Sequence, residues 1–413
     1  MLRVFARLVG LGGAVVEEVS LVGGVVVVHA RAKAAERGRC GRCGRCSPGY
    51  DRGEGRRRWR ALDLGTIRAY VEADAPRVSC PDHGVVVARV PWARHGAWHT
   101  RDFEDQAAWL ATQSSKSAIC RLLRVSWRGV GGIITRVVGD RRARVADPLE
   151  GLRRIGIDEI SYRKGQRYIM GVIDHDSGRL VWAKDGRDAT ILGEFFTLLG
   201  SERCARIALV SCDQGRWVRH ALAEHCPDAV VCMDPFHVVR LASDALDEVR
   251  REVWNAARKR KDGAGARWLK GARWALWKAP ERLTDRQRAK LAHIQNTNQR
   301  LYRAYLLKEQ LRVVFGEPSI DGAIELLDAW IGWAQRSRLP SFVKLAATIR
   351  TDREAIVATL THRLTNARME AANTTIRLIT RRAYGFHSAD ALIALAMLTL
   401  GGLCPPLPDR ATT

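Results

Sequence analysis

Three acidic residues that lie far apart in the sequence stand where carboxylates can hold a metal ion. Asp158 lies within the apolar run 154–160, and Asp213 directly follows a second apolar run, 207–212. Acids at the ends of adjacent strands converge at one edge of a sheet, where divalent cations bind carboxylate oxygens. The third acid, Glu370, lies in a polar, helix-compatible segment much further along. The pattern predicts a site for Mg²⁺ or Mn²⁺ with Asp158, Asp213 and Glu370 as ligands.

A fourth acid, Asp234, competes with Asp213 for the second position. It follows the apolar run 229–233, and His237 comes three residues later. We expect that run to lie further from the strand of Asp158 than run 207–212 does. We therefore favour Asp213 and interpret Asp234 and His237 as supporting residues.

The neighbours of Glu370 favour its role as a metal ligand. On a helix, steps of three and four residues place Asn366, Glu370, Asn373 and Arg377 on one face. An amide can orient a carboxylate, and an arginine can bind phosphate. A surface glutamate on an amphipathic helix is the alternative, in which case Glu354 is the next candidate.

The order of elements around these acids predicts the fold. Strands are expected at 153–160, 168–174 and 179–184, followed by a helix at 188–199 and then by the strands that precede Asp213 and Asp234. The order βββαβαβ is the RNase H-like arrangement, an α/β fold with a mixed sheet flanked by helices. Residues 241–359 have a helical pattern throughout, which predicts an all-α insertion.

Cysteines at metal-ligand spacing occur in the first hundred residues. Cys40 and Cys43 are three positions apart, and Cys80 and His83 repeat that spacing after a strand-like stretch. Two such pairs around a hairpin indicate a zinc ribbon or finger, because Zn²⁺ takes four sulfur or nitrogen ligands. Cys46 is an alternative ligand, and a loop with unligated cysteines is the alternative structure. The other cysteines lie mostly in apolar runs, which favours reduced thiols over a disulfide framework.

A helix, a tight turn and a second helix are expected from residue 115 to residue 138. Trp127 and Arg128 start the second helix, where helix-turn-helix proteins place residues that contact bases. We expect these two residues and Lys116 to contact DNA, although an ordinary helical pair that links domains gives a similar pattern. The predicted core positions are Leu122, Leu123, Val125 and Val130.

The charge of the chain points to a polyanionic partner. Among 413 residues there are 68 Lys and Arg against 44 Asp and Glu, a net charge of +24. Such an excess favours nucleic acid, and no apolar run is long enough for a membrane span. Segment 250–278 interleaves tryptophans with basic residues, which suits either a DNA surface or a helical pair with buried tryptophans. Its candidate DNA contacts are Arg258, Lys259, Arg260 and Lys261.

Taken together and in this order, these pieces resemble the DDE transposases of bacterial insertion sequences, specifically the ISL3 family. The N-terminal cysteine-pair zinc segment with Tyr50 and Asp51 just after it matches, as does the helix-turn-helix. His83 departs from the more usual cysteine, which leaves the ligand at that position open. The remaining matches are Gly156-Ile157-Asp158-Glu159, Ser211-Cys212-Asp213, Asp234-Pro235-Phe236-His237, the segment 366–373 and Arg382-Ala383-Tyr384-Gly385-Phe386.

The resemblance implies an RNase H-like catalytic core that a helical insertion interrupts before the final acid. It also implies binding of the terminal inverted repeats, metal-dependent cleavage and strand transfer into target DNA. Double-stranded DNA would be the partner, with a homodimer or larger assembly forming on it in the cytoplasm, associated with the nucleoid. Two functions from other classes stay open, a DNA-binding regulator without catalysis and an RNase H-like nuclease that cuts without joining.

We expect six segments in the chain. A β-rich zinc domain and a helix-turn-helix precede the two parts of the core, which the helical insertion separates. Their boundaries are 1–100 for the zinc domain, 101–148 for the helix-turn-helix, 149–240 for the first part of the core, 241–358 for the insertion, 359–400 for the final helices and 401–413 for a tail.

Overall fold

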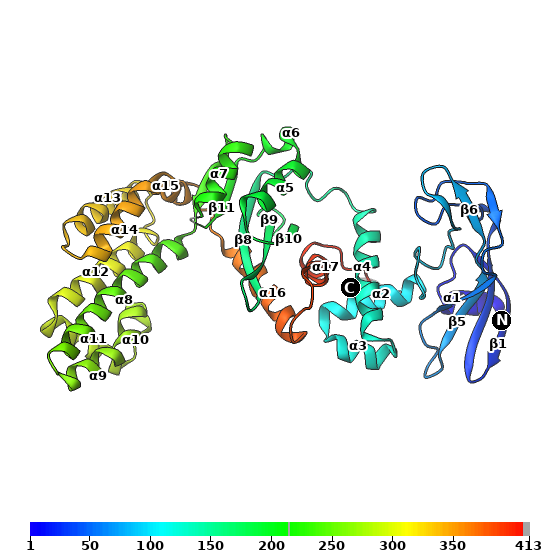
Figure 1. The fold of residues 1–413 in the computed structure, drawn as a ribbon, viewed down its shortest axis with the longest axis horizontal. Helices are drawn as coiled ribbons and strands as arrows, with labels where there is room; N and C mark the ends of the chain where they lie inside the picture. Colours follow the sequence, from blue (N-terminus) through cyan, green and yellow to red (C-terminus); the bar gives the residue numbers. More distant parts are fainter. Residues whose placement is uncertain (214, 408–413) are drawn as a thin grey trace.

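The computed structural model describes residues 1–213 and 215–407. Its parts lie in a row, with a β-rich N-terminal part at one end and a stack of helices at the other (Figure 1). A five-stranded sheet lies between them, next to the helices α2, α3 and α4 (Figure 1). None of the helices in the described ranges has the length and apolar character needed to cross a membrane.

The N-terminal part contains two small sheets. One has the strand order β1-β2-β5-β4, and the other has the order β3-β6-β7 and carries Cys80 at the end of β6. Residues Leu2–Leu8 form a helix, α1, at the start of the domain that the sequence predicts to be β-rich. Phe5 and Val9 lie at helical spacing and pack on the first sheet, which explains the helix. The strands are β1 (Ala14–Val22), β2 (Val25–Ala32), β3 (Gly49–Asp51), β4 (Arg56–Arg60), β5 (Ala69–Asp74), β6 (Arg77–Cys80) and β7 (Gly84–Val87), with a short η1 (Ala34–Glu36).

Three helices follow: α2 (Arg101–Gln113), α3 (Lys116–Leu123) and α4 (Trp127–Arg142). The side chains of Ser115 and Ser126 accept hydrogen bonds at the N-termini of α3 and α4, and Arg124 ends α3 in the left-handed conformation. The two helices of the helix-turn-helix therefore form where they were expected, and α4 continues beyond residue 138 to Arg142. Leu122 is 63% exposed, so its assignment to the core is wrong; Ile119, one turn earlier on the inner face, is buried.

The five-stranded sheet has the strand order β10-β9-β8-β11-β12. The first three strands are antiparallel neighbours, and β11 and β12 run parallel to β8. The chain therefore makes a meander and then two parallel additions on the other side of β8. The elements are β8 (Arg154–Arg163), β9 (Arg167–Asp174), β10 (Leu180–Asp185), α5 (Ala189–Leu199), α6 (Ser201–Cys204), β11 (Leu209–Cys212), α7 (Arg216–His225) and β12 (Val230–Met233).

Helices cover both faces of this sheet. α5 and α7 pack on one face, where Phe195 and Phe196 are fully buried. The other face is covered by α16 (Ala367–Arg382) and α17 (Ala389–Leu400), which share one continuous core with α2, α3 and α4. A Cβ at Gly171 on β9 would lie 3.0 Å from Met369 Cε, so the glycine lets α16 approach the sheet closely.

The helical insertion begins earlier than expected. Its first helix, α8 (Pro235–Lys259), starts directly after Asp234, because proline at the first helical position favours initiation there. Trp330 and Phe342 lie in its separate core. The other elements are α9 (Gly263–Gly271), α10 (Arg273–Trp277), η2 (Pro280–Arg282), α11 (Asp285–Thr297), α12 (Gln299–Val314), α13 (Ile320–Arg336), α14 (Pro340–Thr351) and α15 (Arg353–His362).

Candidate active site, metal centre and DNA-binding surfaces

Three aspartates form a row across the parallel strands. Gly156 on β8 pairs with Ser211 on β11, so Asp158 and Asp213 each come two residues after a paired position. Cys212 pairs with Met233 on β12, and Asp213 and Asp234 each come next. The strand register therefore brings Asp158, Asp213 and Asp234 to the same edge of the sheet, in that order.

Helix α16 adds the fourth acid from the end of the chain. Asn366, the N-cap residue directly before α16, is buried, and its backbone N–H donates to Asp234 Oδ1 at 3.3 Å. One turn further, Glu370 places a carboxylate oxygen within 4.8 Å of ligand atoms of both Asp234 and His237. Asn373, the next residue on this face, donates from Nδ2 to Asp158 Oδ2 at 2.6 Å.

His237 connects the two aspartates that compete for the second position. It lies in the first turn of α8, with Nε2 2.6 Å from Asp213 Oδ1 and 3.9 Å from Asp234 Oδ2. The hydrogen bond to Asp213 raises the pKa of His237, against the opposing effect of burial. In its protonated form, the imidazole offsets part of the negative charge of these carboxylates.

The site is short of positive charge. Burial and the nearby charge of Asp213 raise the pKa of Asp158 to about 7. Burial is also the largest cause of raised pKa values at Glu159, Asp234 and Glu370. Carboxylates that repel one another in this way are stabilised in their ionised form by a bound cation. Oxygen donors of this kind fit Mg²⁺ or Mn²⁺.

The tightest group of potential ligands differs in composition from the predicted set. Within the described ranges, the acids and the histidine with ligand atoms mutually within 4.8 Å are Asp234, His237 and Glu370. Asp213 lies beside this group, in contact with His237. Asp158 is close enough to Asp213 for the charge of Asp213 to raise its pKa. Asp234 Oδ2 is buried and has no hydrogen-bond partner among the described residues. The geometry thus places Asp234 and His237 inside the acidic cluster.

A buried polar chain behind the acids was not anticipated from the sequence. His175 Nε2 lies 2.7 Å from Ser211 Oγ, which donates to Asn366 Oδ1 at 2.8 Å. A Cβ at Gly156 would lie 2.9 Å from His175 Nε2, so only glycine leaves room for this chain. Its members come from separate segments, and a polar residue on a strand gives little signal of such a partner. The chain fixes the start of α16 and thereby the position of Glu370.

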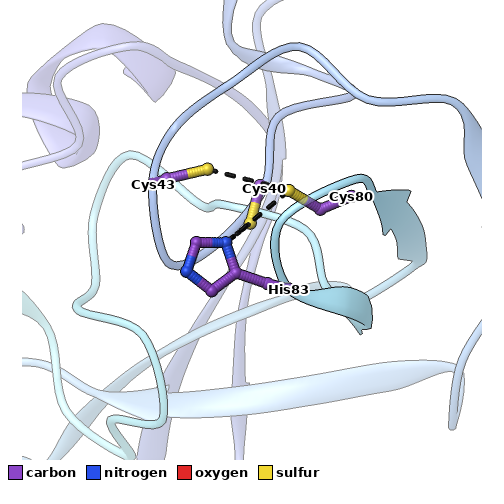
Figure 2. A group of neighbouring side chains, drawn as sticks. All are labelled: Cys40, Cys43, Cys80 and His83. Atoms are coloured by element: carbon purple, nitrogen blue, oxygen red, sulfur yellow. Dashed lines mark hydrogen bonds between the residues drawn. The ribbon is translucent and has the colours of Figure 1, made fainter.

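A second cluster brings together Cys40, Cys43, Cys80 and His83 (Figure 2). Cys43 Sγ lies 3.8 Å from Cys80 Sγ, and His83 Nδ1 lies 3.6 Å from Cys80 Sγ and 3.8 Å from Cys40 Sγ. Tetrahedral zinc with ordinary bond lengths separates two sulfurs by about 3.8 Å and a sulfur from a nitrogen by about 3.6 Å. The four side chains therefore fit Zn²⁺ with three sulfurs and one nitrogen. Cys46 is exposed and lies outside this group.

The predicted DNA contacts of the helix-turn-helix lie together at the start of α4. Trp127 is 46% exposed, and Lys116 Nζ from α3 lies 5.1 Å from the centre of its ring. Arg128, the next residue, is exposed. An exposed ring with two cations beside it suits contact with DNA.

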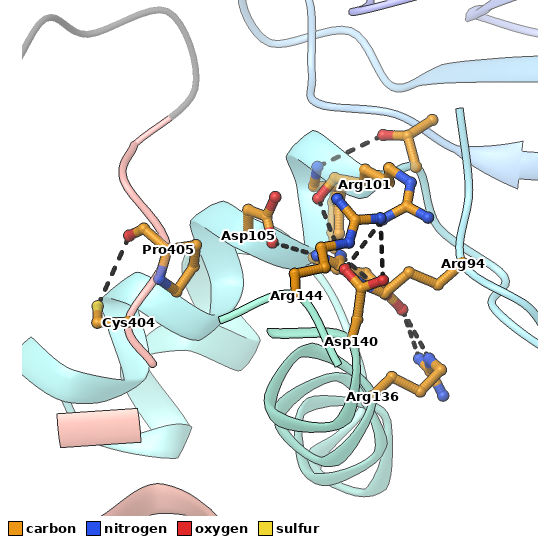
Figure 3. Close-up of polar contacts among 11 residues, drawn as sticks. Arg94, Arg101, Asp105, Arg136, Asp140, Arg144, Cys404 and Pro405 are labelled. Atoms are coloured by element: carbon orange, nitrogen blue, oxygen red, sulfur yellow. Dashed lines mark hydrogen bonds and ion pairs between the residues drawn. The ribbon is translucent and has the colours of Figure 1, made fainter. Parts of the chain in front are cut away.

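A buried charge network joins the N-terminal part to α2 and α4 (Figure 3). Arg94 is 6% exposed, and its guanidinium contacts Asp105 at 2.6 Å, Asp140 at 3.0 Å and Glu104 at 3.4 Å. Arg136 on α4 donates two further hydrogen bonds to Glu104, which is fully buried. Removing one partner of such a network leaves an unpaired buried charge, so the network holds the two parts in one orientation.

The basic segment 250–278 has both packed and exposed tryptophans, so it combines a packed helical pair with an exposed basic surface. Trp254, Trp268 and Trp277 pack against the core of the insertion, whereas Trp274 is 58% exposed. Arginines cover the packed rings, with the Arg258 guanidinium 5.0 Å from Trp254 and that of Arg273 4.1 Å from Trp277. The basic cluster Arg258, Lys259, Arg260 and Lys261 is exposed at the end of α8.

Three family models match the chain. A model described as a transposase matches residues 155–396. The helix-turn-helix domain of transposase family ISL3 matches residues 88–138, and the zinc-finger of transposase IS204/IS1001/IS1096/IS1165 matches residues 36–83. The matches follow the expected order and include the sheet with its acids, helices α3 and α4, and the four zinc-cluster residues.

Individual relatives agree with the family models. The transposase for insertion sequence element IS1557 of Mycobacterium tuberculosis is 52% identical over 407 residues, which cover 94% of this chain and 91% of the relative. The transposase for insertion sequence element IS1001 of Bordetella parapertussis is 26% identical over 337 residues, covering 81% of this chain and 82% of the relative. The similarity therefore spans nearly the whole molecule.

Proposed function

Because the chain belongs to the ISL3 family of insertion-sequence transposases, we propose that it binds the terminal inverted repeats of its element, cleaves there and transfers the ends to target DNA. The sheet β8–β12 with its helices is then an RNase H-like catalytic core. The observation that carries the proposal is the aligned row of Asp158, Asp213 and Asp234, with Glu370 brought to it by α16.

We assign Asp158, Asp213 and Glu370 as the metal ligands. Mg²⁺ or Mn²⁺ held there would activate water or a 3′-hydroxyl as the nucleophile and stabilise the leaving oxygen. Asn373 orients Asp158 through its 2.6 Å hydrogen bond, and Asn366 fixes the start of α16. Burial raises the pKa of Glu370, and the charge of Arg377, one further step along the face, offsets part of that rise. Arg377 is also available to a phosphate.

Asp234 and His237 have a supporting role in this proposal. The contact of His237 with Asp213 holds that carboxylate at the edge of the sheet. Burial is the largest cause of the raised pKa of Asp234, and Asp234 Oδ1 accepts a hydrogen bond from the backbone N–H of Asn366. Asp234 thus ties the sheet to α16 and is less available to a metal than the more exposed Asp213.

DNA binding is divided among several parts of the chain. Zn²⁺ at Cys40, Cys43, Cys80 and His83 would fold the N-terminal ribbon, and α4 would enter a groove with Trp127 and Arg128. The basic end of α8 would contact phosphates during cleavage or target capture. We further propose that the protein acts as a homodimer or larger assembly on DNA, because transposition joins two ends.

Acid-to-amide variants test the assignment of catalytic residues. Purified Asp158→Asn and Asp213→Asn proteins should bind end DNA normally and lose both cleavage and strand transfer in Mg²⁺. Asp234→Asn should retain part of its activity, and the opposite ranking of Asp213 and Asp234 would exchange their roles. Cleavage without joining by the wild type would indicate a nuclease, and binding with no metal-dependent cleavage would indicate a regulator.

A further inference from the structure

A cleft of about 490 Å³ separates the zinc loop from the C-terminal half of α4. Its walls come from the loop at residues 41–44, from β4, from the loop at residues 87–97, and from α2 and α4. The charge network described above forms its base. Arg101 and Arg144 also bind Asp140 there, so four arginines meet three carboxylates, which leaves one positive charge unmatched.

Three more arginines line the cleft and make no salt bridge with a carboxylate in the described part of the chain: Arg42, Arg57 and Arg89. Arg42 and Arg89 are exposed. The Arg57 guanidinium lies 4.2 Å from the centre of the Trp98 ring, and its Nη2 donates to the carbonyl of Ala97 at 2.8 Å. Its Nε is buried and lacks a hydrogen-bond partner among the described residues.

Resting on the function proposed above, we propose that this cleft binds the sugar–phosphate backbone of duplex DNA, with Arg42, Arg57 and Arg89 contacting phosphates. The excess charge matches a polyanion, and guanidinium groups bind phosphate oxygens in pairs. Arg57 is held in place by its two aromatic neighbours, so little conformational entropy is lost when it binds.

The position of the cleft relative to α4 fits one continuous duplex. Trp127 and Arg128 lie at the first turn of α4, and Asp140 lines the cleft near its other end. The intervening helix is about 20 Å long, close to half a turn of B-DNA, about 17 Å. A helix lying along the major groove can contact the backbone with its C-terminal end, as in homeodomains. The cleft would therefore hold the strand that borders the groove read by α4.

The test compares two double variants of the full-length, zinc-loaded protein. Arg42→Gln/Arg89→Gln removes two charges inside the cleft, and Arg3→Gln/Arg7→Gln removes two exposed charges on α1, outside it. Binding of a fluorescent, random-sequence duplex is measured by anisotropy across a NaCl series. Zinc content and melting temperature establish that each variant is folded.

Loss of two phosphate contacts should reduce the slope of log K against log salt by about 1.8 for the cleft variant. Its affinity should fall about tenfold at low salt, and the control should keep the wild-type slope. Equal behaviour of the two variants, or no binding of duplex by the wild type, would overturn the proposal. Saturable binding of inorganic phosphate, lost in the cleft variant without a DNA-binding defect, would instead assign the cleft to a free anion.

The outcome is separable from that of the catalytic proposal. Asp158→Asn leaves the cleft intact, so cleavage by that variant would refute the catalytic assignment and leave the cleft result standing. Conversely, normal DNA binding by the cleft variant alongside metal-dependent cleavage by the wild type would refute only the cleft.

Discussion

Asn373 Nδ2 donates a 2.6 Å hydrogen bond to Asp158 Oδ2, which joins the last part of the chain to the first strand of its central sheet. Asn373 is 2% exposed, and its Oδ1 has no hydrogen-bond partner among the described residues. The hydrogen bond to Asp158 is therefore the interaction that the Asn373 amide makes with the site, and it orients the aspartate. Residues that orient metal ligands in this way commonly affect metal affinity or activity by about 10- to 100-fold.

We expect Asn373→Ala to reduce cleavage of end DNA by about that factor, because Asp158 would lose its orientation. Raising the Mn²⁺ concentration should restore part of the activity, whereas DNA binding should not change. The control is Thr374→Ala, the neighbouring exposed residue on the same helix. A defect in Asn373→Ala that metal does not relieve, together with a lower melting temperature, would mean that Asn373 serves only packing.

Glu370→Gln removes the charge of the third acid and keeps its size. We expect cleavage to fall about 1000-fold, since a lost metal ligand costs about 4 kcal/mol of transition-state stabilisation. Glu354→Gln on α15 is the matched control, because Glu354 is exposed and lies outside the acidic cluster. Single-turnover cleavage of a labelled end fragment measures both. Full activity of Glu370→Gln with loss in Glu354→Gln would transfer the role to Glu354.

The zinc cluster predicts a single zinc ion per full-length chain. Cys40→Ser should release the metal and unfold the ribbon, because zinc binding supplies much of the folding free energy of such small domains. Cys46→Ser should retain it, since Cys46 lies outside the cluster. Elemental analysis of the purified variants measures the zinc content. Retention by Cys40→Ser with loss in Cys46→Ser would show that the other cysteine pair binds.

His99 predicts a loss of stability in mild acid. It stacks on Phe103 with ring centres 4.7 Å apart, and burial together with the charges of Arg136 and Arg60 lowers its pKa to about 4. An unfolded histidine titrates near 6.5, so the unfolded chain gains a proton that the folded chain resists. The stabilisation is complete above pH 6.5 and is lost as the pH falls towards 4.

Chemical unfolding at several pH values should therefore show a smaller decline between pH 6.5 and 4 in His99→Phe than in the wild type. The aromatic replacement keeps the stacking on Phe103 and removes the titration. His362→Phe is the comparison, because His362 is exposed at the end of α15. An unchanged pH dependence in His99→Phe would mean that other groups cause the decline.

The sequence predicted the parts of the fold that depend on local pattern. The strands before Asp213 and Asp234 are apolar runs, and the serine caps of α3 and α4 mark the helix-turn-helix, so each was visible in a short window. The first helix, α1, was missed because seven residues are too few to show a helical period. Leu122 was misplaced because an eight-residue helix offers too few positions to define its buried face.

The contacts between distant segments could not be predicted in the same way. Nothing near Asn373 in the sequence indicates Asp158, and nothing near Ser211 indicates His175 or Asn366. Arg94 gave no signal either, because its partners Asp105 and Asp140 come from two helices that follow it. These pairs depend on the packing of α16 and α4 against the rest of the molecule, which no local pattern encodes.

The place of α16 after the helical insertion determines the order in which a ribosome completes the working parts of the molecule. The zinc cluster and α3–α4 emerge first, and the helix that carries Glu370 emerges only after α8–α15. On the function proposed here, a nascent chain can recognise DNA well before it can break it. A polypeptide cut short within the insertion would keep its recognition elements without the third acid, and would occupy transposon ends in competition with the intact enzyme.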